Sequence, residues 1–251
     1  MSSEKIAIVS DFDGTITLRD VGHHFFEKFI PDRKAHEDLL EKWKIGLISS
    51  RECLEKEVAG VEAGVADLDD FIEDEPLDPF FKDFVDFCNR RRFELMILSD
   101  GLDYYIDSIL MRYGFGFIEF KSNHLVTEGD RIAGVEFPWY LPELCDMCAN
   151  CKKAHVDQMR GEGYFTVYIG NGYSDRCPSG HADLVFAKDD LLDHCEREKI
   201  DCLAFRNFRD VERELMSRFF LSEYSPQSDR FLSGRRYSPA CCSSILLISS
   251  R

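Results

Sequence analysis

The chain of 251 residues is 44% hydrophobic, which is enough for one α/β core with a substantial interior and a small cap. Its formal net charge of −16 argues against nucleic acid or an anionic membrane as a partner, because both would repel the chain. Residues 1–5 lack a basic region followed by an apolar stretch, and no apolar run approaches the length of a membrane span, so we expect a cytoplasmic protein.

The first predicted strand, residues 6–10, ends in two carboxylates. Side chains two residues apart on an extended backbone point the same way, so Asp11 and Asp13 can converge on one site at the carboxyl edge of the strand. Gly14 then allows the chain to turn, and Thr15 adds a hydroxyl. The pattern favours a site for Mg²⁺ and phosphate, although acidic pairs at strand ends also serve as turn or helix-cap residues.

The next segment, residues 19–75, predicts helices. Apolar residues recur at helical spacing around Phe25 and again around Leu39, and turn signals are few. Pro76 and Pro79 mark the return to the core. We interpret this segment as a helical cap inserted after the first acidic motif.

A second strand with a polar turn follows a helix predicted over residues 80–92. The apolar run 95–98 leads into Ser99, Asp100 and Gly101, ahead of another predicted helix. The Ser99 hydroxyl and the amides of the two residues after it can bind an anion at the start of that helix. Ser99 can equally serve only as a cap for the helix.

Residues 115–139 alternate like strands and predict a small β insertion, about 115–151, with cysteines at its far end. The spacing of Cys145, Cys148 and Cys151 suits a structural zinc or an iron–sulfur site. A fourth ligand would have to come from His124, His155 or Cys177. The alternative is an insertion in which the cysteines are structural or redox-sensitive and hold no metal.

The last motifs flank a helix predicted over residues 154–161. Lys152 or Lys153 can supply positive charge to a phosphate, although a lone lysine is usually a solvated surface charge. A strand then ends before Asn171, and Asp175 follows four residues later. These oxygen-bearing side chains lie, like those of the earlier motifs, just after a strand.

Strands that alternate with helices predict an α/β fold with a doubly wound parallel sheet, whose ligands bind beyond the carboxyl ends of the strands. The predicted core comprises residues 1–18 and 76–221, with the helical cap over 19–75 between them. Residues 222–251 are rich in Ser and Arg and predict a disordered tail.

The order of the motifs, an Asp pair, a serine, a lysine and a closing Asp, resembles the haloacid dehalogenase superfamily of phosphatases, in its phosphoserine-phosphatase-like branch. The resemblance implies that Asp11 is a nucleophile that forms an aspartyl-phosphate. Asp13 would protonate the leaving group and then take a proton from water. Ser99, with the amides of Asp100 and Gly101, would bind the phosphate, and Lys152, which follows a cysteine as in similar proteins, would neutralise it.

Mg²⁺ is the cofactor that the resemblance implies. Its ligands would come from Asp11, Asp13, Asn171 and Asp175. The family usually has an aspartate where this chain has Asn171. An amide oxygen can still bind Mg²⁺ but brings no negative charge, so we expect a weaker metal site, with a catalytically silent member as the alternative.

The cysteine cluster ahead of Lys152 is similar to that of the methionine-salvage (MtnX-like) phosphatases and of phosphoethanolamine and phosphocholine phosphatases. We therefore expect a small phosphorylated metabolite as substrate, first the diketo or enol phosphate of methionine salvage. Phosphoserine, phosphocholine, phosphoethanolamine and pyridoxal phosphate are alternatives. A transferase that shares the aspartyl-phosphate, or a non-catalytic sensor of phosphometabolites, is also compatible with the motifs. We expect a monomer or a homodimer.

Three residues at the start of the cap are candidates for substrate specificity: Arg19, Asp20 and His23. Asp20 falls where phosphoserine phosphatases have a glutamate that is thought to bind the substrate amine, but it can also be the N-cap of a helix. The sequence therefore does not identify the substrate.

Overall fold

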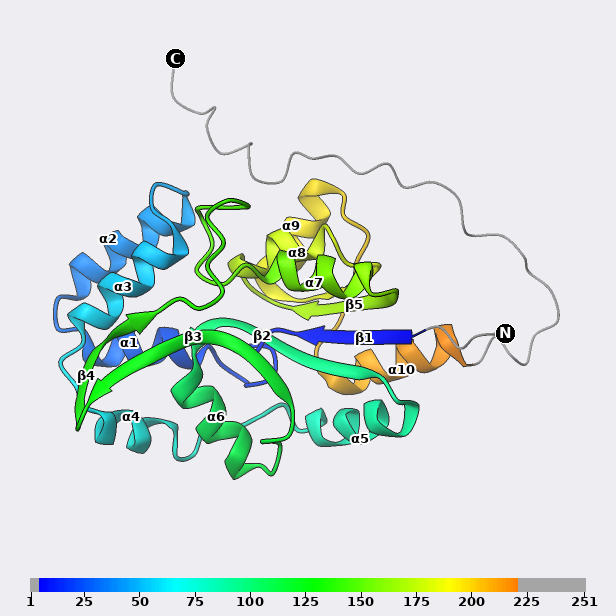
Figure 1. The fold of residues 1–251 in the computed structure, drawn as a ribbon, viewed down its shortest axis with the longest axis horizontal. Coiled ribbons are helices and arrows are strands. Elements are labelled where there is room, and N and C mark those ends of the chain that lie inside the picture. The colour runs from blue at the N-terminus through cyan, green and yellow to red at the C-terminus, as the bar shows by residue number, and fades with distance from the viewer. Residues whose placement is uncertain (1–4, 221–251) are drawn as a thin grey trace, which may run out of the picture.

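The computed structural model describes residues 5–220, and it shows a central sheet with helices on both faces (Figure 1). The strands are β1 (Lys5–Ser10), β2 (Glu94–Leu102), β3 (Glu119–Glu128), β4 (Arg131–Glu136), β5 (Tyr164–Gly170), β6 (Leu184–Ala187) and β7 (Leu203–Ala204). They form a seven-stranded sheet in the order β4-β3-β2-β1-β5-β6-β7. Every pair of neighbours is parallel except β3 and β4, which confirms the predicted α/β fold with a doubly wound sheet. The predicted tail, 222–251, lies outside the described residues.

The helices of the core cover both faces of the sheet. They are α5 (Phe81–Arg91), α6 (Asp103–Arg112), α7 (Lys152–Gly161), α8 (Arg176–Ser179), α9 (Asp189–Glu198) and α10 (Phe208–Phe219), with a short 3₁₀ turn over Tyr173–Asp175. Helices α5, α6 and α10 lie on one side of β1, and α7, α8 and α9 lie on the other (Figure 1). None of the described helices is long and apolar enough to span a membrane.

The central strand β1 alternates between the two layers. Ile6 and Ile8 belong to the large core cluster with α5, α6 and α10, whereas Ala7 and Val9 pack with Val156 of α7. Such alternation is the period of an extended chain with both faces covered, and burial of these side chains fixes which residues reach the end of the strand. The strand therefore delivers Asp11 to the edge of the sheet rather than to one of its faces.

The parallel register aligns the strand ends that carry the motifs. Ser10 of β1 pairs with Ile97 of β2 and with Ile169 of β5, so the residues that follow these positions meet at one edge. The helix after Ser99 begins only at Asp103, because β2 continues to Leu102. Ser99 therefore does not cap that helix.

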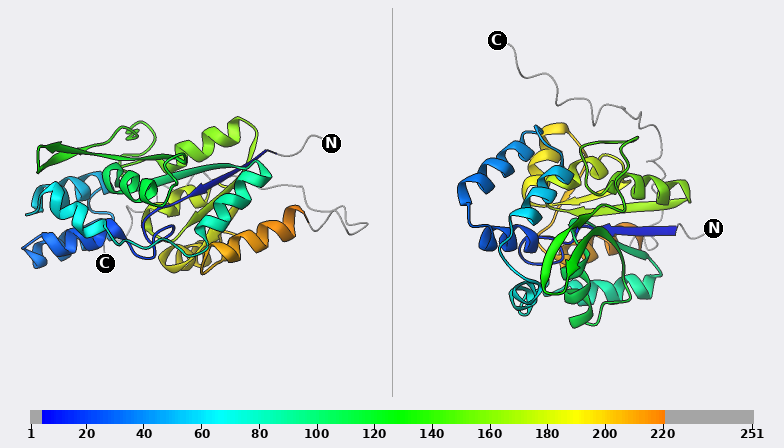
Figure 2. Two further views of the ribbon diagram at one scale, coloured as in Figure 1. Left: turned by 90° about the horizontal axis from the view of Figure 1, so that it is seen from below. Right: turned by 60° about the vertical axis from the view of Figure 1, so that its left-hand side comes forward.

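The four helices that follow β1 form a separate layer at that edge. They are α1 (Val21–Phe29), α2 (Arg33–Lys44), α3 (Ser50–Gly60) and α4 (Val65–Ile72), and all lie within the predicted cap. Figure 2 shows them at the end of the molecule away from the N-terminus, beside the β3–β4 hairpin. The hairpin binds this layer through its turn, where the amide of Val65 donates to the carbonyl of Asp130 at 2.7 Å.

The expected β insertion is continuous with the central sheet through β3. The first part of β3 pairs in parallel with β2 from Glu119 onward, and the second part pairs antiparallel with β4. The cysteine-containing segment follows β4 and runs over residues 137–151 without regular helix or strand. No pattern in the sequence indicates the point at which β3 stops pairing with β2 and begins to pair with β4.

Candidate active site

A cavity of about 480 Å³ lies between the carboxyl edge of the sheet and the cap helices. Its floor on the core side is made by the motif residues Asp11, Asp13, Ser99 and Asn171. The cap contributes apolar and aromatic side chains, among them Phe26, Leu40, Trp43 and Leu54, beside polar ones that include Asp20, His23 and Glu57. A polar floor under an apolar wall is the usual form of a site for a small molecule.

Lys152 is the central cation of the floor. Its Nζ atom donates to Asp11 Oδ1 at 2.7 Å, to Asp175 Oδ1 at 2.8 Å and to Ser174 Oγ at 2.9 Å. The lysine is 2% exposed, and both aspartates are buried. Burial by itself would lower the pKa of Lys152, but Asp11, Asp175 and Asp100 outweigh it and raise the pKa, so the ammonium stays charged.

The two lysines thus have different surroundings. Lys153 forms a partly buried ion pair with Asp157, one turn along α7, at 2.5 Å. The structure brings Lys152, not Lys153, to the aspartates at the sheet edge. Helix α7 begins at Lys152 itself, which points the side chain back along the helix toward the edge.

Asp175 is fully engaged by donors in this arrangement. Its Oδ1 atom accepts from Lys152 and from Tyr168 Oη at 2.6 Å, while Oδ2 accepts from the amides of Asn171 and Gly172. Each oxygen thus has two partners in the structure, and the role of Asp175 at a metal stays a prediction. Its position is that of a residue that holds Lys152 and the loop after β5 in place.

Asp13 is held in a different way from Asp11. Its Oδ1 atom accepts from the amides of Val21 and Gly22 at the start of α1, and Oδ2 accepts from Tyr105 Oη at 2.7 Å and Ser99 Oγ at 3.2 Å. Burial, followed by the charge of Asp20, raises the pKa of Asp13 to about 7. A carboxyl group with that pKa can both give and take a proton near neutral pH.

Tyr105 is a site residue that the sequence analysis missed. It is the third residue of α6 and is 1% exposed. In the sequence, its position is typical of an ordinary core side chain of a helix. A Cβ atom on Gly101 would overlap the Tyr105 hydroxyl and would lie 2.6 Å from Asp13 Oδ2. Glycine at position 101 thus allows the tyrosine to reach Asp13. This glycine was the one feature of the sequence that could have indicated the contact.

Ser99 and Asp100 are tied to the loop that precedes α7. Ser99 Oγ accepts the amide of Gly101 at 2.8 Å, so this amide is directed at the serine in the structure. Asn150 donates to the carbonyl of Ser99 at 3.0 Å, and its amide donates to Asp100 Oδ1 at 3.2 Å. Burial raises the pKa of Asp100 to about 6. Asn150, also missed, fastens the segment that carries Lys152 to the end of β2.

The first and last motifs touch each other at Gly14. A Cβ atom there would lie 2.5 Å from Asn171 Nδ2, and Gly14 has a φ of +71°, which favours glycine. Beside it, Thr15 Oγ1 donates to Asn171 Oδ1 at 2.9 Å and lies 3.3 Å from Asp11 Oδ2. Asn171 and Asp11 therefore present oxygen atoms around the same hydroxyl.

The chemistry of these donors fits a hard divalent cation. Asp11 and Asn171 offer side-chain oxygens, and Asp13 can add its carbonyl, which together make the all-oxygen shell that Mg²⁺ prefers. Burial, followed by the charge of Asp175, raises the pKa of Asp11 even though Lys152 acts in the opposite direction. One lysine thus does not balance the negative charge of the floor, and a divalent cation would.

The three candidates for substrate specificity do not share one location. Asp20 is the N-cap of α1, accepting the amide of His23 at 2.8 Å, and it also lines the cavity. His23 lines the cavity as well. Arg19 lies outside the lining and forms an ion pair with Glu75 at 2.6 Å. Asp20 therefore combines the capping role with a position on the wall of the cavity.

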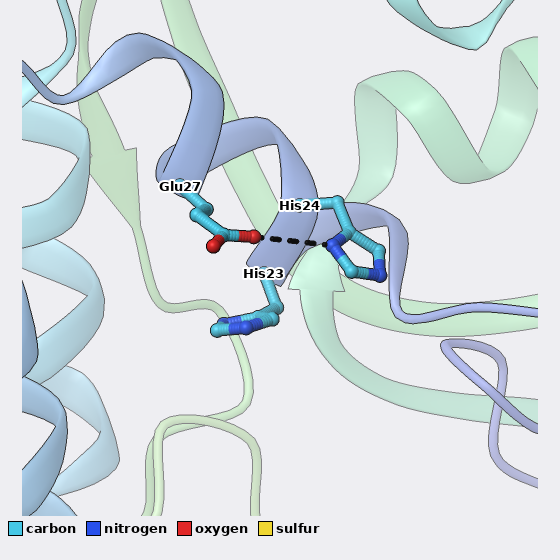
Figure 3. A group of neighbouring side chains, drawn as sticks. All are labelled: His23, His24 and Glu27. Atoms are coloured by element: carbon cyan, nitrogen blue, oxygen red, sulfur yellow. Dashed lines mark hydrogen bonds and ion pairs between the residues drawn. The ribbon is translucent and has the colours of Figure 1, made fainter.

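His23 also belongs to a group of polar side chains on α1 (Figure 3). The ligand atoms of His23, His24 and Glu27 lie within 4.8 Å of one another, and His24 Nδ1 is 3.4 Å from Glu27 Oε2. The structure holds these groups by contacts with each other. Exposed groups of this kind are common without an ion, and we assign no metal to them.

The structure does not support a zinc site at the cysteines. Cys148 Sγ lies 3.6 Å from Cys145 Sγ, while Cys151 begins α7 as its N-cap. The group on α1 is the one set of three ligand side chains that gathers within 4.8 Å in the described part of the chain. The hydrogen bond with Cys145, and then burial, raise the pKa of Cys148, which disfavours the thiolate that zinc requires.

Comparison with known sequences agrees with this site. The family model of haloacid dehalogenase-like hydrolases matches residues 8–177. A 2-hydroxy-3-keto-5-methylthiopentenyl-1-phosphate phosphatase of Brevibacillus brevis is 30% identical over 216 residues, which cover 85% of this chain and 96% of the relative. Pdp3-interacting factor 1 of Schizosaccharomyces pombe is 28% identical over 227 residues, covering 87% and 98%.

Comparison with solved structures agrees with the fold. A phosphoserine phosphatase with a phospho-aspartyl intermediate analogue gives a TM-score of 0.66 at 19% identity, covering 84% of this chain and 99% of that chain. A substrate-bound phosphoserine phosphatase also gives 0.66, at 18% identity, covering 85% and 99%. The matched family model, over residues 8–177, covers more than half of this chain. The chain therefore belongs to the haloacid dehalogenase-like hydrolase family.

Proposed function

We propose that the protein is a Mg²⁺-dependent phosphomonoesterase that works through an aspartyl-phosphate on Asp11. The observation that carries this proposal is the pairing of two different carboxyl groups at one edge. Asp11 is bound to the cation of Lys152, whereas Asp13, held by Tyr105 and two amides, has a pKa of about 7. One group is thus arranged as a nucleophile and the other as an acid and base.

In the first step, an oxygen of Asp11 attacks phosphorus as the ester P–O bond breaks. Asp13 in its protonated form gives its proton to the departing oxygen, so that an alcohol or enol leaves. Lys152 reduces the repulsion between the carboxylate and the phosphate, since both are negative. Ser99, which lines the cavity next to Asp13, can turn its hydroxyl to a phosphate oxygen.

In the second step, Asp13 is a carboxylate and takes a proton from water. The water oxygen attacks phosphorus, the bond between phosphorus and Asp11 breaks, and inorganic phosphate leaves. Asp13 is then protonated again and ready for the next cycle. A bound Mg²⁺, held by Asp11, Asn171 and the Asp13 carbonyl, would supply positive charge to the phosphoryl oxygens.

For the substrate, we propose a small phosphorylated metabolite, first the enol or diketo phosphate of methionine salvage. The similarity to the Brevibacillus brevis phosphatase over almost its whole length supports this choice. The apolar cap wall formed by Phe26, Leu40 and Leu54 also suits a thioether tail. A cytoplasmic location and a monomer or homodimer remain part of the proposal.

The test is a phosphate-release assay with an aryl phosphate and a panel of phosphometabolites. The panel contains the methionine-salvage phosphate, phosphoserine, phosphocholine, phosphoethanolamine and pyridoxal phosphate. We expect Mg²⁺-dependent turnover by the native protein, and a loss of at least about a thousandfold with Asp11→Asn, because an amide is a poor nucleophile. Circular dichroism checks that the variant folds.

Three results would contradict the proposal. Binding of a phosphometabolite without any turnover would indicate a sensor. Turnover that survives in Asp11→Asn would remove Asp11 as the nucleophile, even if the protein is a phosphatase. Transfer of phosphate to an added alcohol in preference to water would indicate a transferase with the same intermediate.

A further inference from the structure

One buried acid–base pair in the cap has no role in the proposed chemistry. Glu57 of α3 and His36 of α2 are 8% and 5% exposed, and His36 Nε2 lies 2.8 Å from Glu57 Oε1. Burial raises the pKa of Glu57, and the contact with His36 acts against that rise; when Glu57 is ionised, His36 Nε2 is the donor. The pair joins two cap helices by a contact that apolar side chains would make at lower cost.

Glu57 faces the substrate rather than the interior of the cap. It lines the cavity, together with Asp20 and His23 from α1. Among the described residues, the one hydrogen bond of its carboxyl group is that of Oε1 with His36. Oε2 is not one of the fully buried atoms without a partner, so it is accessible from the cavity that Glu57 lines.

A substrate group is the natural donor for that oxygen. A ligand that covers this oxygen without supplying a donor would leave it buried and unpaired, which is costly, so the site discriminates against ligands that lack the matching donor. Asp20 adds a second carboxyl group to the part of the wall near Glu57, and Lys44 is a cation that the cap contributes elsewhere in the lining. Next to Glu57 and Asp20, a hydroxyl or an ammonium group is favoured over a carboxylate.

We propose that Glu57 determines specificity by accepting a hydrogen bond from a hydroxyl or ammonium group on the leaving group of the substrate. His36 acts as a positioning residue that fixes the carboxylate through Oε1. The substrate class is then a phosphate monoester of a small alcohol or enol that carries a second donor on its chain. This inference rests on the proposed function, because it assigns the leaving-group side of the same site.

The test compares esters that differ only in the donor. The first set contains 2-hydroxyethyl, 3-hydroxypropyl and 2-aminoethyl phosphate, and the matched set contains propyl and butyl phosphate. We expect kcat/KM of the native protein to favour the first set by about tenfold or more, and Glu57→Gln to reduce that preference at least about fivefold, most for the ammonium ester. p-Nitrophenyl phosphate, whose leaving group has no donor, should change less than twofold.

The matched control is Glu55→Gln. Glu55 lies on the same helix, but it is exposed and pairs with Arg51 at 3.2 Å, so this change should leave every ester unaffected. The second variant is Glu57→Asp, which keeps the carboxylate but places it farther from the cavity because the side chain is one methylene shorter. It should lose part of the preference. It replaces Glu57→Gln if that protein does not fold.

Three results would overturn the inference. The first is equal turnover of both ester sets by the native protein. The second is a preference that Glu57→Gln and Glu57→Asp leave unchanged. The third is an equal loss with p-nitrophenyl phosphate, which would make the pair merely structural. If the native protein hydrolyses none of these esters, calorimetric binding of the two sets to Asp11→Asn, with and without Glu57→Gln, tests the preference separately from the proposed function.

Discussion

The two sides of the cavity are built in different ways. On the sheet side, each charged group has several partners, as with Lys152, which donates to two aspartates and a serine. On the cap side, apolar and aromatic side chains dominate, and the polar contacts are single pairs such as His36 with Glu57. The sheet side is anchored to strands in register, whereas the cap side is carried by helices joined by short turns.

This difference separates chemistry from selection. Phosphoryl transfer requires groups that are fixed before the substrate binds, which strands and buried ion pairs provide. Recognition of the leaving group requires a surface that varies between proteins without disturbing those groups. Substitutions on the sheet side should therefore change turnover for every substrate, and substitutions on the cap side should change it for particular substrates.

After the loss expected for Asp11→Asn, the largest effect is expected at Asp13. Asp13→Asn removes the proton donor, so hydrolysis of alkyl phosphates should fall by about a hundredfold or more, the usual contribution of a general acid. An ester with a good leaving group needs the proton less and should lose less in the first step. A leaving-group series measured in single turnovers checks this, and equal losses across the series would exclude the acid role.

Tyr105 should set the pKa of Asp13. The Tyr105 hydroxyl, 2.7 Å from Asp13, stabilises the carboxylate form of Asp13. Tyr105→Phe removes this donor, so the pKa of Asp13 should rise from about 7 to a higher value. The rate with alkyl phosphates should fall about tenfold, and its decline at high pH should move to higher pH. A pH–rate profile decides between this effect and a simple loss of packing, which would lower the rate without moving the profile.

Asn171, on the sheet side of the cavity, should set the Mg²⁺ concentration that activity requires. Asn171→Asp adds a negative charge beside Asp11, so half-maximal activity should need several-fold to about tenfold less Mg²⁺. A Mg²⁺ titration at fixed substrate measures this, with Asn89→Asp on the exposed side of α5 as the matched control. An unchanged titration would mean that position 171 does not contact the ion.

Trp43 tests the cap side where it meets the core. Its ring centroid lies 4.9 Å from that of Tyr173, and its Nε1 donates to Ser50 Oγ at 2.9 Å. Trp43→Ala should raise KM about fivefold for the preferred metabolite, which corresponds to one aromatic contact, while kcat for an aryl phosphate changes little. Phe117→Ala, at an exposed aromatic residue, is the control. A large fall in kcat for all substrates would contradict the separation of roles.

The smallest effect concerns stability against pH. An unfolded Asp titrates near pH 3.9, whereas Asp13 titrates at about 7, so the protonated form favours folding and that contribution is lost as pH rises through 7. Between pH 5.5 and 8, the metal-free native protein should lose on the order of 1 kcal/mol relative to Asp13→Asn, about 2–4 °C in Tm. His155, whose pKa burial lowers to about 4, acts in the opposite direction in both proteins and cancels.

Thermal melts at the two pH values measure this difference. Mg²⁺ should reduce it, because a cation favours ionised carboxylates. A difference between the proteins that does not depend on pH would show that Asp13 does not titrate in this range.

The sequence by itself determined the chemistry-bearing residues of the sheet edge. Apolar runs that end in Asp11, Ser99 and Asn171 predicted parallel strands, and the parallel register brings their ends together. The two-residue spacing of Asp11 and Asp13 and the order of the motifs were local patterns. Such patterns survive because a strand fixes the direction of each side chain over short distances.

Only the tertiary structure decided how these residues divide the work. Lys152 is distinguished from Lys153 by its contact with Asp11, 141 positions away in the sequence, and by its contact with Asp175. Tyr105 and Glu57 look like ordinary helical residues until the fold aims one at Asp13 and the other at the cavity. Burial and neighbouring charge depend on packing between distant segments, and the local sequence contains neither.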